Sequence, residues 1–335
     1  MMRWQTFIGL FMAAASAVVA GVVLWVVWPF PTPKQSALRA VKHWDYQLQQ
    51  INLDRLAQSA SDLVVMDYSR NGTGAGAYTR ADVERVRLRP DGSRRLVIAY
   101  LSIGEAEEYR YYWQPAWKET PPDWLFAENC RWPGNHMVRY WMAPWKAIIF
   151  EGTDSYLSRI IAAGFDGVYL DRVDAYWDLR EQHPEGRTAM IGFVRQFAER
   201  ARAMKSDILI VAQNAEDLLS DAKYRRSIDA IAKEDLIHGV KASGERNDNA
   251  LIIWSLAQLQ LLKSERKPVF VVEYLQRLEH AAATKQEILS HGFGPVFPPR
   301  ALDGRDPFDL LPAAPVVVAA SPQTGTPEYG IKHCK

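Results

Sequence analysis

The feature that most constrains the fold is a regular alternation of short apolar segments with amphipathic helical segments. The apolar segments have the length and flanking turn residues of buried strands. The predicted strands are Trp44–Leu48, Leu63–Met66, Leu96–Leu101, Met137–Met142, Gly167–Leu170, Ile208–Ala212, Asp229–Ala232 and Val269–Val272. Eight strands in simple alternation with helices over about 250 residues predict an α/β fold, a (β/α)8 TIM barrel. A doubly wound open sheet is the alternative.

Helices are predicted between these strands. They begin at Asn52 or Asp54 and near Thr79, and they cover Asp154–Ala163, Thr188–Met204, Asn249–Leu262 and Ala281–Leu289. No shift in composition marks a second domain, so we expect one barrel over residues 44–291. A proline-containing linker is expected over residues 31–43, and a C-terminal extension of loop and partial disorder over residues 292–335.

The first 30 residues predict a membrane anchor or a signal peptide. Phe7–Trp28 is 22 residues long without a charge and follows Arg3, which is enough to span a bilayer. Ala15–Ala17 offers a cleavage site for a secretory signal, but the apolar run continues beyond it. We expect an extracytoplasmic protein, either anchored in the inner membrane through this segment or secreted into the periplasm. Cys130 and Cys334 are then free to form a disulfide, which their spacing does not show.

The overall composition excludes some partners and suggests others. The formal net charge of +1 gives no footprint for nucleic acid. The chain holds 12 Trp and 14 Tyr, and many fall in loops, for example Tyr111, Trp113 and Trp117. Such rings either cover hydrophobic edges or stack on the faces of sugars.

Acidic residues follow five of the predicted strands. They are Glu105 with Glu107, Asp171 with Asp174, Glu216, Glu234 with Asp235, and Glu273. In a parallel barrel these strand ends meet at one rim, so the rim is expected to be strongly acidic. Crowded carboxylates raise each other's pKa. Any one of them is explained by a helix cap or a salt bridge, but all five together indicate a cationic substrate, a metal or catalysis.

Side-chain alternation predicts which residues face into the barrel. If Asp171 points inward, Tyr169 and Gly167 do too; if Glu234 points inward, Ala232 does too. The strands that carry the two carboxylates are two apart, about 9–10 Å between backbones. The carboxyl groups are then either about 5.5 Å or about 6.5–9.5 Å apart, which covers both retaining and inverting glycoside hydrolysis.

No competing catalytic motif is present. The sequence has no HExxH, no GxSxG and no Walker loop. Its histidines are scattered, so no cofactor or metal site is predicted from them. Metal held by the acids alone remains open.

Four segments together resemble glycoside-hydrolase family 114, the endo-α-1,4-polygalactosaminidase-like barrels. They are AYLSIGEAEEYR (Ala99–Arg110), GFDGVYLDRVDAY (Gly164–Tyr176), QNAEDL (Gln213–Leu218) and the strand that ends at Glu234. The first two are long and specific, and the resemblance covers about Trp44 to Leu289. A similar domain occurs in a bacterial exopolysaccharide (Pel) biosynthesis protein.

The resemblance implies a (β/α)8 barrel that hydrolyses galactosamine-containing polymers outside the cytoplasm. It points to Asp171 and Glu234 as the catalytic carboxylates, without assigning acid and base. We expect the cleft to be lined by residues at and after the strand ends: Asp67, Tyr100, Glu105, Glu107, Tyr169, Asp174, Tyr176, Asn214, Glu216, Glu273 and Tyr274. One departure from the family pattern is Arg172 after the first Asp, which we expect to face away from the barrel interior and either to pair with an acid or to narrow the groove.

Three functions follow as hypotheses. The first is a glycoside hydrolase that cuts within a cationic aminosugar polysaccharide, which suits an acidic, aromatic groove. The second is a non-catalytic polysaccharide-binding or exopolysaccharide-assembly barrel. The third is a metal-dependent hydrolase that uses the acid cluster.

Overall fold

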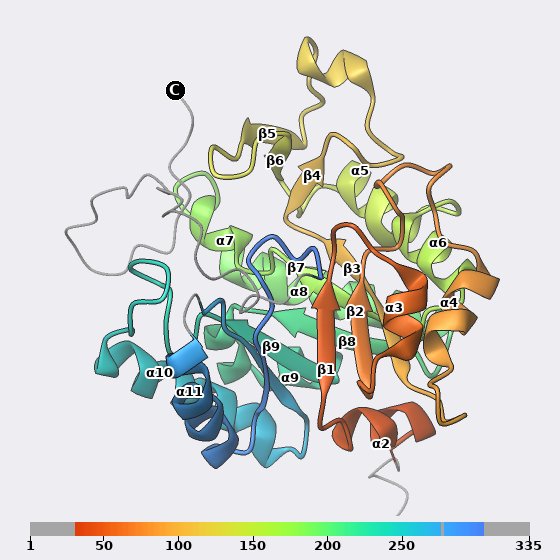
Figure 1. Ribbon diagram of the computed structural model, residues 1–335. Helices are drawn as coiled ribbons and strands as arrows, with labels where there is room; N and C mark the ends of the chain where they lie inside the picture. Colours follow the sequence, from red (N-terminus) through yellow and green to blue (C-terminus); the bar gives the residue numbers. More distant parts are fainter. Residues whose placement is uncertain (1–30, 276–277, 305–335) are drawn as a thin grey trace, which may run out of the picture.

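The computed structural model describes residues 31–275 and 278–304, and at its centre is a sheet of eight parallel strands (Figure 1). In sheet order they are β1 (Trp44–Gln47), β2 (Leu63–Met66), β3 (Leu96–Ser102), β7 (Gly167–Asp171), β8 (Leu209–Gln213), β9 (Ala230–Glu234), β10 (Val269–Val272) and β11 (Gly294–Val296). β1 and β11 lie side by side, and the Trp44 indole donates to the Gly294 carbonyl at 3.1 Å. The sheet is therefore a nearly closed barrel, as the sequence predicted.

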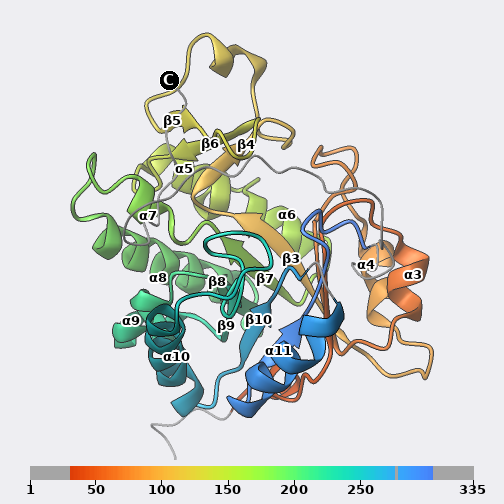
Figure 2. The ribbon, with the colours of Figure 1, turned by 60° about the vertical axis from the view of Figure 1, so that its left-hand side comes forward.

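Helices surround this barrel on the outside (Figures 1 and 2). The α-helices are α2 (Pro33–Arg39), α3 (Leu53–Gln58), α4 (Arg80–Arg87), α5 (Ala143–Lys146), α6 (Tyr156–Ala162), α7 (Ala175–Asp178), α8 (Gly186–Met204), α9 (Ala222–Ser227), α10 (Asn249–Ser264) and α11 (Leu278–Ser290). Short turns of 3₁₀-helix form η1 (Pro115–Lys118) and η3 (Glu216–Ser220), and η2 (Ala147–Glu151) is a π-helix. Asn52 and Thr79 cap α3 and α4 with their side chains, because each accepts a hydrogen bond from an otherwise unpaired backbone N–H.

The barrel interior and the helix layer form two separate apolar clusters, and the predicted alternation is confirmed. Tyr169 and Ala232 belong to the interior cluster, whereas Val168 and Ile231 pack under the helices. Position 167 requires glycine, because a Cβ there would lie 2.5 Å from the Leu209 carbonyl oxygen of the neighbouring strand.

The predicted fourth barrel strand is wrong. β3 pairs directly with β7, with Tyr100 opposite Tyr169, so no strand fits between them. Instead β6 (Asn135–Val138) is the middle strand of a small antiparallel sheet, between β4 (Glu105–Glu107) and β5 (Leu125–Glu128). This sheet lies beyond one end of the barrel in both views (Figures 1 and 2). Met137 and Val138 are both buried, and Val138 belongs to the apolar cluster of the helix layer rather than to the barrel interior.

The eighth barrel strand is β11, which lies in the tail that we expected to be loop. β11 pairs in parallel with β10, with Val296 opposite Val272, so the barrel extends beyond the predicted end at residue 291. Its sequence, Gly294-Pro295-Val296, has too few apolar residues to show a periodic pattern. Gly292 makes the preceding turn with a φ of 70°, a conformation that glycine adopts without strain.

The segment predicted as a linker contains α2, which belongs to the barrel. Leu38 on α2 is buried in the interior cluster at the N-terminal ends of the strands. Thr32 and Gln35 form a capping box that fixes where this helix begins. The apolar stretch Phe7–Trp28 and Cys334 lie outside the described residues. None of the helices in the described part of the chain has the length and apolar composition of a membrane span.

Candidate active site

Two carboxylates lie on the same rim of the barrel. Asp171 is the last residue of β7 and Glu234 the last residue of β9, with β8 between these strands. Both lie in register with inward-facing residues, Tyr169 and Ala232. Each is only partly exposed. The structure therefore places the two predicted catalytic residues at the C-terminal end of the barrel, where active sites of this fold occur.

Asp171 accepts its hydrogen bonds from neutral donors. Its Oδ2 accepts from the Tyr100 hydroxyl at 2.6 Å, and its Oδ1 accepts from the Arg172 backbone N–H at 2.7 Å. Burial and then the negative charge of Glu234 raise the pKa of Asp171 to about 7, although Tyr100 and the Arg172 charge oppose the shift. A carboxyl with this pKa can hold or release a proton near neutral pH.

Glu234 is held in a similar way. It accepts from the Tyr274 hydroxyl and, at 3.4 Å, from the Asn214 side-chain amide, whose oxygen accepts the Glu234 backbone N–H at 3.0 Å. Burial and the neighbouring Asp235 raise its pKa, while Tyr274 and Arg300 lower it. Arg300 binds Asp235 at 3.0 Å and lies 4.2 Å above the Tyr274 ring. This arginine follows β11 and could not be placed from the sequence.

Tyrosine rings pack inside the barrel, including one on the strand that leads to Asp171. The rings of Tyr169 and Tyr46 are 5.2 Å apart inside the barrel. Burial, and then the negative charges of Glu234 and Asp171, raise the pKa of Tyr169 well above its ordinary value. The Tyr169 hydroxyl is buried and has no hydrogen-bond partner within the described residues.

The backbone turns sharply after each of the three strands of this site. Arg172, Asn214 and Asp235 have φ values of 58°, 56° and 52°. Non-glycine residues in this region carry strain of about 1–3 kcal/mol each, and such strain gathers at functional sites. The turn at Asn214 aims its side chain at Glu234 across the strand boundary.

Arginines neutralise most of the other acids that were expected to line an acidic groove. Arg172 binds Glu105 at 2.7 Å, Asp174 at 2.9 Å and also Asp178. Arg172 therefore pairs with acids, which is one of the two outcomes expected for it. Asn129 also donates to Glu105 at 2.9 Å.

Arg110 does the same for a second pair. It is 3% exposed and binds Asp67 at 2.8 Å and Glu107 at 2.5 Å. Tyr109 also donates to Glu107. The expectation of a strongly acidic rim is therefore corrected, because these carboxylates are buried and paired with arginine.

Glu216 and Glu273 do not line the site. Glu273 is fully buried and accepts from the backbone N–H groups of Ile237 at 2.7 Å and His238 at 3.1 Å, so it anchors the loop after β9. Glu216 is buried against Ser255 at 2.7 Å and Lys233 at 3.5 Å, behind the sheet. Both predictions are corrected: these side chains are on the outward side of the barrel wall.

An aromatic cavity of about 390 Å³ adjoins the rim after β7 and β8. Tyr176 and Asp217 form part of its wall, joined by a hydrogen bond from the tyrosine hydroxyl. Trp177 on α7 and Trp254 on α10 also line it, and their side chains are about two-fifths exposed. Only Tyr176 was predicted among these. Trp254 follows its strand by some twenty residues of loop and helix, so no local pattern identifies it.

No metal site is apparent in this part of the molecule. Across residues 31–275 and 278–304, no group of three or more His, Cys, Asp or Glu side chains is placed to hold a metal ion. His183 stacks on Trp141 at 4.2 Å and His136 on Trp113 at 4.9 Å, so both pack against rings.

Other proteins are similar to this chain in sequence. The model of glycoside-hydrolase family GH114 matches residues 28–309. An uncharacterized protein of Deinococcus radiodurans is 36% identical over 277 residues, which is 82% of this chain and 85% of that protein. An uncharacterized protein of Thermotoga maritima is 36% identical over 70% of this chain and 71% of that protein.

A solved structure shares the fold. The glycoside hydrolase domain of PelA from Pseudomonas aeruginosa superposes with a TM-score of 0.61 at 19% identity, over 78% of this chain and 96% of that domain. At this identity the similarity is one of architecture. The family match, together with the barrel and its rim carboxylates, leads to one conclusion: the chain belongs to glycoside-hydrolase family GH114.

Proposed function

We propose that this glycoside hydrolase cuts within a galactosamine-containing polysaccharide outside the cytoplasm, with Asp171 and Glu234 as its catalytic carboxylates. The observation that carries the proposal is the coupled pair itself. The two acids end strands on either side of β8, and burial together with the charge of Glu234 raises the pKa of Asp171 to about 7. Glycoside hydrolysis needs one protonated and one ionised carboxyl at the same time, and two coupled acids share a proton in this way.

The surroundings of the pair support a catalytic role over a purely binding one. Other acids of this rim are bound by Arg172 or Arg110, which stabilise fixed charges. Asp171 and Glu234 instead accept hydrogen bonds from Tyr100 and Tyr274. A neutral tyrosine donor orients a carboxyl and favours its ionised form less strongly than an arginine cation does.

Purified protein incubated with acetylated and deacetylated polymers of galactosamine and glucosamine tests the substrate. We expect new reducing ends from the galactosamine polymers, with internal cleavage seen as a broad range of product sizes in mass spectrometry. Binding without product over several days would favour the non-catalytic barrel instead. Activity that a chelator removes and a divalent cation restores would support the metal-dependent alternative.

The aromatic cavity leads to a separate prediction about how KM depends on the length of the polysaccharide. Trp177→Ala or Trp254→Ala should raise KM for long polymers about 3–10-fold, because stacking on an aromatic ring contributes about 0.5–1.5 kcal/mol. kcat should stay within about twofold, since neither ring contacts the reacting carboxylates. Steady-state kinetics on polymers and on short oligosaccharides measure this.

Ile253→Ala is the matched control for Trp254. Ile253 is the preceding residue on α10, 66% exposed, and does not line the cavity. Equal KM values for the two tryptophan variants and wild type on long polymers would remove the cavity from the substrate path.

A further inference from the structure

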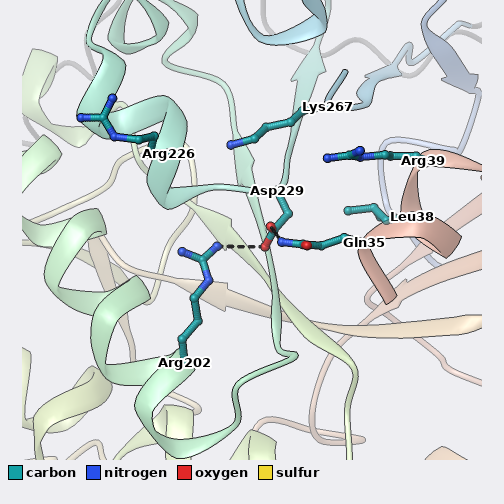
Figure 3. Close-up of a pocket in the computed structure, with 7 residues that line it drawn as sticks. All are labelled: Gln35, Leu38, Arg39, Arg202, Arg226, Asp229 and Lys267. Carbon is teal, nitrogen blue, oxygen red and sulfur yellow. Dashed lines mark hydrogen bonds and ion pairs between the residues drawn. The ribbon is translucent and has the colours of Figure 1, made fainter. Parts of the chain in front are cut away.

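A second pocket lies at the opposite end of the barrel from the carboxylates (Figure 3). Asp229 directly precedes β9 and Lys267 shortly precedes β10, so the pocket is at the N-terminal ends of the strands. Its volume is about 190 Å³. It is lined from α2, α8, α9 and the strand entries by Gln35, Leu38, Arg39, Arg202, Arg226, Asp229 and Lys267.

Asp229, the only acid in the pocket lining, already accepts hydrogen bonds from the protein. The carboxylate of Asp229 accepts from the Gln35 side chain at 2.8 Å, from Arg202 at 3.1 Å and from the Ile210 backbone N–H at 2.9 Å. Figure 3 shows Gln35 and Arg202 approaching it from two sides. Asp229 and Arg202 therefore neutralise each other inside the wall.

Within the described residues, the remaining cations of the lining, Arg39, Arg226 and Lys267, form no salt bridge. Lys267 donates to the Ile228 carbonyl at 2.8 Å, and Arg39 and Arg226 have no hydrogen bond or ion pair within residues 31–275 and 278–304. Burial lowers the pKa of Lys267; the charges of Asp229 and Glu265 oppose this shift, and those of Arg202 and Arg39 add to it. Four cations and one acid give the lining a formal charge of 4 − 1 = +3.

Helix ends offset only part of this charge. α2, α8 and α9 end near the pocket, and each helix C-terminus carries about −0.5 of an elementary charge. Three of them supply about −1.5, so the lining stays positive by more than one charge. An anion is the ligand that this surplus favours.

We propose that this pocket binds a phosphoryl group, either of free phosphate or of an anionic lipid headgroup. A tetrahedral oxyanion presents oxygens in several directions, which suits cations that come from separate elements. The pocket includes α2, which begins five residues after the predicted membrane segment ends at Trp28. A lipid phosphate bound here would hold the barrel with its catalytic end directed away from the bilayer. The proposal is independent of the substrate of the enzyme.

Isothermal titration on the full chain in a non-ionic detergent tests this proposal. One arm uses inorganic phosphate, a second uses soluble short-chain phosphatidylglycerol, and a third uses the matching zwitterionic phosphatidylcholine. The variant is Arg39→Gln/Arg226→Gln, whose side chains have no partner to lose in the described residues, so its fold is expected to be retained. The control is Arg195→Gln/Arg55→Gln, which removes the same charge from α8 and α3, away from the pocket.

We expect saturable binding with one site per chain in wild type and in the control, and at least about tenfold weaker binding in the pocket variant. Binding of inorganic phosphate but not phosphatidylglycerol identifies a free phosphate as the ligand. Preference for phosphatidylglycerol over phosphatidylcholine identifies the lipid. No saturable binding in any arm, or equal affinity in the pocket variant and the control, would overturn the proposal.

Discussion

Asp171→Asn is expected to lower the rate of polymer cleavage by at least about 10³-fold, because proton transfer from a positioned side chain contributes about 10²–10⁴-fold and an amide cannot supply it. Glu234→Gln is expected to do the same. Both changes keep the shape of the side chain, and the single asparagine oxygen can keep one of the two hydrogen bonds that Asp171 accepts, either from Tyr100 or from the Arg172 backbone N–H. Release of reducing ends from the active polymer measures the loss.

The same Asp171→Asn variant is expected to be more stable than wild type at high pH. The folded pKa of about 7 is raised above the ordinary value of 3.8, so the folded state binds the proton more tightly than the unfolded state. Wild-type stability from this group is present below pH 4 and is lost as pH rises to about 7. The variant avoids this loss, so its free energy of unfolding at pH 8 should exceed that of wild type by about 1–3 kcal/mol, after allowing for the interaction of Asp171 with Glu234.

Asp91→Asn is the matched control, because Asp91 is an exposed loop residue bound only by nearby side chains and backbone. Its activity should equal that of wild type. Urea unfolding at pH 4 and pH 8 measures the stability difference. Substantial cleavage by either active-site variant would exclude that residue from catalysis.

Arg110→Met is expected to destabilise the protein by about 3–5 kcal/mol, because it leaves two buried carboxylates without their cation. Asp67 and Glu107 are 6% and 2% exposed and both bind Arg110. The loss should be smaller at pH 4 than at pH 8, since protonation removes the unpaired charges. Urea unfolding measures it.

Arg195→Met is the comparison for this effect. Arg195 forms an exposed pair with Glu199 on the surface of α8 at 3.0 Å, and its loss should change stability by about 0.5 kcal/mol or less. If Arg110→Met were as stable as Arg195→Met, the buried network would have no structural role.

The sequence predicted the barrel and the position of Asp171 and Glu234 at its rim because both depend on local patterns. Apolar strands and helix caps such as Thr79 are readable over a few residues. Alternation also placed Tyr169 and Asp171 on one side of β7 correctly. The same rule applied to β10 would have put Glu273 outside, in phase with Val271 and opposite to Tyr274.

Other features were out of reach because they depend on contacts between distant residues. The insertion between β3 and β7 contains a real strand, β6, and its pairing with β4 and β5 places it outside the barrel. The pairing of Arg110 with Asp67 joins residues 43 positions apart. Arg300 reaches Asp235 from beyond the predicted end of the barrel. A count of acids therefore overestimated the negative charge of the rim.

The central claim is that Asp171 and Glu234 form one coupled pair, and a titration of the Asp171 carboxyl carbon by ¹³C NMR tests it most directly. In wild type the pKa of Asp171 should be about 7. In Glu234→Gln it should fall, because the negative neighbour is gone while burial and the Tyr100 hydrogen bond remain. An ordinary pKa near 4 in wild type, or the same pKa in both proteins, would contradict the account.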